Sequence, residues 1–140
     1  MKNQDLKDKY DSVFKEGAYN FFTSDGFHEA LNIAASYDWR EKKVLDIGCG
    51  EGRLGSTIAG AGASEVVGVD YSTEAIKNAQ SRFDLPNLKF ICSDYKSINE
   101  KFDAVTMQGV MEHFDNPWDE LKNILDNYLV EDLSLIHISE

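Results

Sequence analysis

The pattern of hydrophobic and polar positions along the chain changes near residue 41. Over 5–36 apolar side chains recur at a helical spacing, and four of them share one face at positions i, i+3, i+4 and i+7: Phe27, Ala30, Leu31 and Ala34. From residue 43 onward, short apolar runs alternate with helical stretches. We therefore expect an N-terminal helical segment over 1–40 and an alternating strand and helix core over 41–129, within a single domain of 1–140.

Four apolar runs bounded by polar residues predict strands, which span 43–48, 65–70, 87–92 and 102–107. A helix over 53–59 follows the first run. A second helix begins after Ser72, whose hydroxyl suits an N-cap, and is stopped by Pro86. Strands and helices that alternate at this spacing imply right-handed crossovers and a parallel sheet with helices on both faces. The predicted fold class is α/β.

The helix with the clearest start signal comes after the fourth run. Asn116 is predicted as its N-cap, Pro117 as its first residue and Asp119 as its third. One apolar stripe then continues to Leu129. These signals predict an amphipathic helix that packs on the sheet.

The tail over 130–140 has two interpretations. The alternation in 135–138 permits a fifth strand, which would pair with the fourth and form an unprotected edge of the sheet. Residues 133–140 also look like translated sequencing adaptor at the end of a truncated reading frame. An edge strand and a non-native tail both stay open.

Composition and charge exclude several classes of protein. With 42% hydrophobic residues over 140 positions, the chain can bury a core. No apolar run approaches the roughly 20 residues of a membrane helix, so we expect a cytoplasmic location and no membrane partner. The net charge is −11 and the only basic doublet, Lys42–Lys43, is expected at the solvated start of a strand. We therefore do not expect nucleic acid as a binding partner.

The segment 44–54, Val-Leu-Asp-Ile-Gly-Cys-Gly-Glu-Gly-Arg-Leu, contains the main chemical signal. It predicts a strand that ends in Asp46 and is followed by Gly48, Gly50 and Gly52. Glycines at such a turn let a ligand lie against backbone N–H groups, and the acid attracts an ammonium group rather than a phosphate. The third glycine of this triplet comes one residue earlier than in the dinucleotide fingerprint. We interpret the turn as a site for a cationic ligand that carries a nucleoside.

Two more acids follow predicted strands. Asp70 closes the second strand, where a carboxylate can accept hydrogen bonds from both hydroxyls of a ribose. Asp94 follows the third strand beside Tyr95, and this pair could hold an adenine, although Asp94 alone is more typical of a turn or cap. Because parallel strands end at one edge of a sheet, we expect Asp46, Asp70 and Asp94 to lie along a common ledge.

Together these segments resemble the class I methyltransferases that use S-adenosylmethionine. The resemblance rests on 44–52 as the glycine motif, 66–71 as the ribose-binding strand and 102–113 as the fourth-strand motif, and it covers about residues 40–125. It implies a Rossmann-like sheet of strand order 3-2-1-4-5, with the last strands of the full fold missing. It also implies S-adenosylmethionine as cofactor, S-adenosylhomocysteine as product, and methyl transfer to an unidentified acceptor. The acidic charge favours a small-molecule acceptor.

The resemblance also implies which residues contact the cofactor. From the methionine part to the adenine, they are Asp46, Gly48, Cys49 and Gly50, then Asp70 for the ribose, Tyr71 for the adenosine face, and Asp94 with Tyr95 for the adenine. Gln108 would close over the cofactor near the methyl group. His113 is the candidate catalytic base if the acceptor must lose a proton, since imidazole titrates near neutral pH.

Two other functions stay open. A non-catalytic module of the same fold would bind a nucleoside or a partner protein without turnover, and its exposed strand edge would favour a homodimer. A nicotinamide oxidoreductase is disfavoured by the glycine spacing, although Asp70 would serve it equally well. No Cys or His spacing indicates a metal site, and Cys49 and Cys92 are interpreted as small buried residues.

Overall fold

The computed structural model describes residues 31, 34–108, 114–130 and 135–138. Most of the predicted N-terminal helix over 5–36 lies outside these residues. Its last turn, 34–36, is helical.

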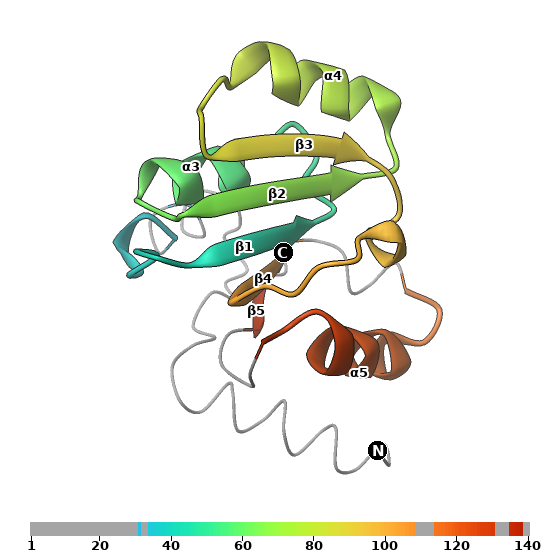
Figure 1. Ribbon diagram of the computed structural model, residues 1–140. Coiled ribbons are helices and arrows are strands. Elements are labelled where there is room, and N and C mark those ends of the chain that lie inside the picture. The colour runs from blue at the N-terminus through green and yellow to red at the C-terminus, as the bar shows by residue number, and fades with distance from the viewer. Residues whose placement is uncertain (1–30, 32–33, 109–113, 131–134, 139–140) are drawn as a thin grey trace.

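Five parallel strands form one sheet (Figure 1). They are β1 (Lys43–Ile47), β2 (Glu65–Asp70), β3 (Leu88–Cys92), β4 (Ala104–Gln108) and β5 (Leu135–Ile138). Their order is β3-β2-β1-β4-β5, which confirms the predicted fold class and strand order. The backbone of 135–138 thus forms a strand beside β4, and β5 is the last strand of the order at that edge.

Helices cover both faces of the sheet (Figure 1). They are α3 (Arg53–Gly60), α4 (Thr73–Arg82) and α5 (Pro117–Asn127), with a short 3-10 helix, η1 (Tyr95–Ser97). α5 packs on one face, whereas α3 and α4 pack on the other. None of the helices in the described ranges is long and apolar enough to cross a membrane.

The two faces are built from alternate residues of each strand, because successive side chains of a strand point to opposite sides. Leu45 and Val105 belong to the cluster under α5, and Val44 and Val66 belong to the cluster under α3. All four side chains are fully buried, as is typical of a parallel sheet covered on both faces.

Three predicted details are corrected by the structure. α4 ends at Arg82, before Pro86, because the chain is already extended at Phe83. Asn116 does occupy the N-cap of α5, but its Nδ2 donates to Asp119 Oδ2 at 2.6 Å and its side chain caps no backbone N–H. Leu129 lies beyond the helix and forms a bridge with Phe102.

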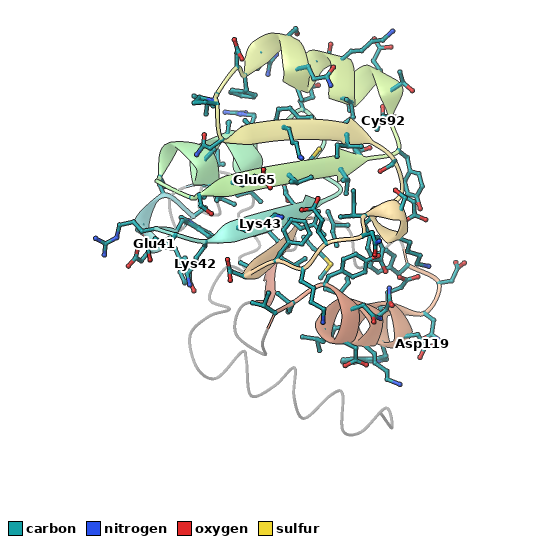
Figure 2. All side chains as sticks on the ribbon, viewed as in Figure 1. Glu41, Lys42, Lys43, Glu65, Cys92 and Asp119 are labelled. Carbon is teal, nitrogen blue, oxygen red and sulfur yellow. The ribbon has the colours of Figure 1, made fainter. Side chains whose placement is uncertain are left out.

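Figure 2 labels residues at both ends of the strands: Lys43 and Glu65 at the amino ends of β1 and β2, and Cys92 at the carboxyl end of β3. At the amino ends, Lys43 Nζ pairs with Glu100 and lies 3.6 Å from Glu65 Oε1, so this lysine is neutralised by acids. The doublet that contains it lies at the start of β1, as predicted. Cys92 lies at the carboxyl end of β3 and is exposed, so its interpretation as a buried residue was wrong.

Candidate functional site

A glycine turn connects β1 to α3 at the carboxyl edge of the sheet. The turn is fastened to β2 by the Cys49 N–H, which donates to the Val69 carbonyl at 2.9 Å. Gly50 and Gly52 have φ values of 55° and 89°, a backbone region that side chains other than glycine rarely adopt. The sequence therefore forms this turn only because glycine stands at these positions.

The two glycines have different surroundings. A Cβ built on Gly52 would lie 2.5 Å from Phe90 Cζ, so this glycine lets α3 begin against the buried ring. A Cβ built on Gly50 would meet nothing within 4 Å. The backbone at Gly50 therefore has space in front of it, as a ligand that approaches the turn requires.

Asp70, the last residue of β2, is fixed by the backbone around it. Its Oδ2 accepts from the Gly50 N–H at 2.9 Å, and its Oδ1 accepts from the Ser72 N–H at 2.9 Å. Ser72 in turn caps α4 by accepting from the Ala75 N–H at 3.1 Å. The carboxylate is thus oriented by its own fold and remains half-buried at the edge of the sheet.

Asp46 lies deeper than the sequence predicted. It is the fourth residue of the five in β1, and only 1% of it is exposed, because its side chain points to the face covered by α3. The Thr106 hydroxyl donates to Asp46 Oδ1 at 2.8 Å, whereas Oδ2 has no hydrogen-bond partner among the described residues. A buried carboxylate oxygen without a partner is costly.

The electrostatic surroundings of Asp46 disfavour its charged form. Burial is the main reason that the pKa of Asp46 is raised to about 7; the Thr106 hydrogen bond acts in the opposite direction, and the negative charge of Asp70 contributes to the rise. Burial also raises the pKa of the Cys49 thiol, with smaller contributions from Asp46 and Asp70. The site therefore holds a neutral thiol and two neighbouring acids, and it favours a positively charged group.

Asp94 and Tyr71 lie beside Asp70. The Ser93 N–H donates to the Asp70 carbonyl at 3.0 Å, which brings the chain after β3 against the end of β2. Asp94 caps η1 by accepting from the Lys96 N–H at 3.0 Å. Tyr71 is 77% exposed, and its pKa is raised by desolvation and then by the charge of Asp94. The three predicted acids therefore belong to adjacent strands or the turn after one: Asp46 lies within β1 and is buried, whereas Asp70 at the end of β2 and Asp94 after β3 are half-buried.

Tyr95 does not face this edge as a base-stacking residue would. Only 5% of it is exposed, and its ring packs against Tyr128 and Phe114 with centroids 5.5 Å and 6.3 Å away. Its hydroxyl donates to Glu120 on α5. Burial and this hydrogen bond raise the pKa of Tyr95. The structure places Tyr95 in the core under α5, and we remove it from the candidate adenine contacts.

The positions of two predicted site residues, Gln108 and His113, are not tested by the structure. The backbone of Gln108 ends β4 and pairs with Ile138 of β5, but its side chain is not among those that the structure describes. His113 lies outside the described residues altogether.

Gly55, in the first turn of α3, was missed by the sequence interpretation. A Cβ built on it would lie 3.6 Å from both Leu88 Cδ1 and Val66 Cγ1 and 3.7 Å from Asp46 Oδ2. It thus permits close packing of α3 on the sheet. Counted from Gly50 and Gly52, it also completes a G-x-G-x-x-G pattern. Glycine spacing therefore does not separate a dinucleotide site from an S-adenosylmethionine site in this chain, and it does not disfavour a nicotinamide cofactor as predicted.

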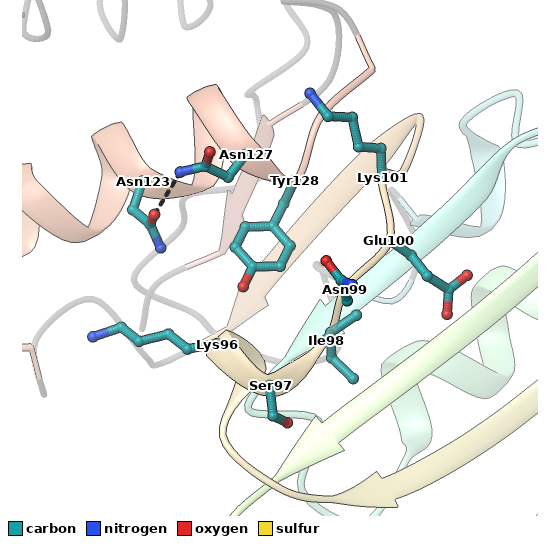
Figure 3. A pocket seen from close by; sticks show the side chains of 9 residues that line it. All are labelled: Lys96, Ser97, Ile98, Asn99, Glu100, Lys101, Asn123, Asn127 and Tyr128. Carbon is teal, nitrogen blue, oxygen red and sulfur yellow. Dashed lines mark hydrogen bonds between the residues drawn. The ribbon is translucent and has the colours of Figure 1, made fainter.

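A hollow of about 760 Å³ lies away from the glycine turn (Figure 3). It is lined by residues 96–101 and by Asn123, Asn127 and Tyr128 at the end of α5. The Asn127 amide donates to Asn123 Oδ1 at 2.7 Å across its wall. None of the predicted cofactor residues lines it.

Comparison with known proteins decides between the cofactor classes. A family model described as a methyltransferase domain matches residues 44–128. The chain belongs to the class I S-adenosylmethionine-dependent methyltransferase family. The match includes β1 to β4, the glycine turn and α5.

Individual relatives differ in what they modify. The chain is 32% identical over 130 residues to the tRNA U34 carboxymethyltransferase of Pseudomonas savastanoi pv. phaseolicola, covering 82% of this chain and 40% of the relative. It is 37% identical over 109 residues to the ubiquinone biosynthesis O-methyltransferase of Glaesserella parasuis, covering 70% and 44%. The solved plantazolicin methyltransferase BpumL, in complex with SAH, is 30% identical with a TM-score of 0.54, covering 61% and 34%. The chain thus spans less than half the length of each.

Proposed function

We propose that this chain binds S-adenosylmethionine at the carboxyl ends of β1, β2 and β3 and takes part in methyl transfer to a small-molecule acceptor. The observation that carries the proposal is the buried Asp46 carboxyl, whose Oδ2 has no partner among the described residues, next to a glycine turn with open space at Gly50. A cationic ligand would supply the missing partner.

The residues present fit the cofactor in chemical type. Asp46 would face its positively charged amino group, and Asp70 would accept hydrogen bonds from the ribose hydroxyls. Asp94 and Tyr71 would contact the adenosine end. Gly48, Cys49 and Gly50 would lie along the methionine part through their backbone, since the Cys49 thiol is buried.

The chain's contribution to the reaction is mainly positioning. When bound, S-adenosylmethionine supplies an activated methyl group on a sulfonium. The protein then has to hold the donor and the acceptor in line and exclude water, which accounts for large rate effects in such transfers. The roles of Gln108 near the methyl group and of His113 as a base stay predictions.

The choice of a small-molecule acceptor rests on charge. The net charge of −11 disfavours a nucleic-acid surface, and the ubiquinone-biosynthesis relative is consistent with a small acceptor. The tRNA-modifying relative has the opposite implication, so RNA belongs in the acceptor screen. The cytoplasmic location and a homodimer along the β5 edge also stay predictions.

A binding experiment tests the cofactor proposal. Thermal melting with S-adenosylmethionine, S-adenosylhomocysteine and NAD should show stabilisation by the first two compounds, because a ligand that binds only the folded state raises the Tm. Stabilisation by NAD alone, or by none of the three, would refute the proposal. Binding without methyl consumption in a screen of small acceptors and tRNA would favour the non-catalytic module.

A substitution tests the ribose assignment. We expect Asp70→Ala to weaken S-adenosylhomocysteine binding by about 1–3 kcal/mol, the usual effect of leaving polar partners unsatisfied. Asp70→Asn retains an acceptor oxygen and separates loss of charge from loss of the turn. Asp84→Ala, an exposed acid after α4, is the matched control. Equal affinities for the Asp70 and Asp84 variants in calorimetry would contradict the assignment.

A further inference from the structure

Two polar side chains face each other inside an otherwise apolar layer. Asp46 and Thr106 are each 1% exposed, and they are the buried polar residues of the described part of the chain. They are register partners on the neighbouring strands β1 and β4. The residues before them on the same face, Val44 and Ala104, are apolar and fully buried. A hydroxyl in this position is therefore not explained by packing on the sheet.

The geometry of the pair is directional. The Thr106 hydroxyl donates to Asp46 Oδ1 at 2.8 Å, and the β-branched side chain of threonine restricts its rotation. An ionised carboxylate can only accept, so this bond favours the charged form of Asp46 and fixes the plane of its carboxyl group. The other oxygen, Oδ2, lies beside Gly55 in the first turn of α3 and has no described partner.

We propose that Thr106 is a positioning residue, which holds the Asp46 carboxylate for the cationic amino group of the cofactor and sets the pH range over which the cofactor binds. This inference rests on the proposed function. Thr106 itself does not touch the cofactor in this scheme and acts through Asp46.

The charged groups around Asp46 define the pH dependence. Among the described residues, the titratable groups that act on it are Asp70 on β2 and the Cys49 thiol of the glycine turn. α3 presents Gly55 and β4 presents Thr106, and neither titrates. Asp70 is negative and the thiol is neutral, so neither of these groups offers Asp46 a positive charge, and in the proposal an arriving cation is its counter-charge.

The sign of the effect follows from this arrangement. The pKa of Asp46 is about 7 in the free chain, mainly because of burial, so below neutral pH the residue must lose a proton before it can pair with a cation. Affinity should therefore rise with pH and level off above neutral. Removal of the Thr106 hydroxyl should move the midpoint upward by about 1–2 pH units, as expected for a hydrogen bond to a charged group.

The test is calorimetry with S-adenosylhomocysteine between about pH 5.5 and pH 9. On the acid side, Thr106→Val should bind about 10- to 100-fold more weakly than the wild type, and the two curves should converge at high pH. Thr106→Ser, which restores the hydroxyl, should return the wild-type midpoint. Thr57→Val is the control, since the Thr57 hydroxyl donates to the Arg53 carbonyl within α3 and, among the described residues, makes no hydrogen bond with Asp46. Titration of the ligand itself is common to all variants.

The outcomes separate the inference from the proposed function. No binding by the wild type at any pH refutes the cofactor proposal. Binding with the same midpoint in wild type and Thr106→Val refutes the role of Thr106 alone. If the valine variant does not fold, Thr106→Ala takes its place. The Asp46 carboxyl carbon of the wild-type chain can also be titrated by NMR, and its midpoint must fall when S-adenosylhomocysteine is added. An unchanged midpoint in a chain that binds the ligand refutes the pairing of Asp46 with the cofactor, and with it the role of Thr106.

Discussion

Replacement of Asp46 by asparagine should stabilise the free chain at neutral pH while it weakens cofactor binding. Asparagine has nearly the same shape, can still accept the Thr106 hydrogen bond, and has no charge to bury. The wild-type carboxyl carries a cost of burial that depends on pH. A pH-dependent difference in stability between the two proteins therefore isolates the cost of the buried charge.

The magnitude comes from the shift in pKa. Asp46 moves from an ordinary value of 3.8 to about 7 in the folded chain, and each unit corresponds to about 1.36 kcal/mol. Between these two values the folded chain binds more protons than the unfolded chain, so the stability of the wild type falls as the pH rises. The full effect is about 4 kcal/mol, and roughly 3 kcal/mol of it lies between pH 5 and pH 8.

Urea unfolding at pH 5 and at pH 8 measures this effect. The difference in unfolding free energy, Asp46→Asn minus wild type, should increase by roughly 3 kcal/mol from the lower to the higher pH, because the other titrating groups are shared and cancel. Any constant cost of the new amide cancels as well. Asp126→Asn, an exposed position on α5, should show no such change. A difference that is the same at both pH values would refute the account of Asp46.

Two further substitutions test the turn and the cap that shape the site. Gly52→Ala should lower the unfolding free energy by about 2 kcal/mol or more, because the new side chain combines positive-φ strain with a collision against the Phe90 ring. Gly60→Ala is the control: its Cβ would meet nothing within 4 Å, so the substitution should be neutral or slightly stabilising. Equal effects of the two substitutions in urea unfolding would contradict this reasoning. Ser72→Ala should cost about 1 kcal/mol through loss of the cap on α4, and a loss below about 0.3 kcal/mol would show that the cap contributes little.

The burial of Asp46 has opposite effects on the stability of the free chain and on the binding of a cation. A buried acid next to Asp70 lowers the stability of the folded chain at neutral pH. The same burial keeps water away from Asp46 and so strengthens the attraction between its carboxylate and a bound cation. The predicted gain in stability of Asp46→Asn and its predicted loss of binding have one physical origin.

Local patterns in the sequence were enough to locate the elements of the sheet. Apolar runs with polar boundaries marked β2 at its observed limits and β1, β3 and β4 within two residues, because each strand is buried on both faces. The acids at the strand ends and the glycine turn were likewise readable, since the carboxyl ends of parallel strands meet at one edge. Hydrophobic alternation also indicated β5, whose backbone pairs with β4.

The burial of individual site residues and the identity of their hydrogen-bond partners were decided only by the tertiary structure. Whether Asp46 is exposed depends on the face to which the fourth residue of β1 points and on α3 lying over it, and its partner Thr106 is 60 residues away. Tyr95 directly follows Asp94 in sequence, yet its ring is buried in the core and its hydroxyl donates to Glu120 on α5. Periodicity along the chain encodes which residues alternate, but the element that covers each face is set by packing between segments distant in sequence.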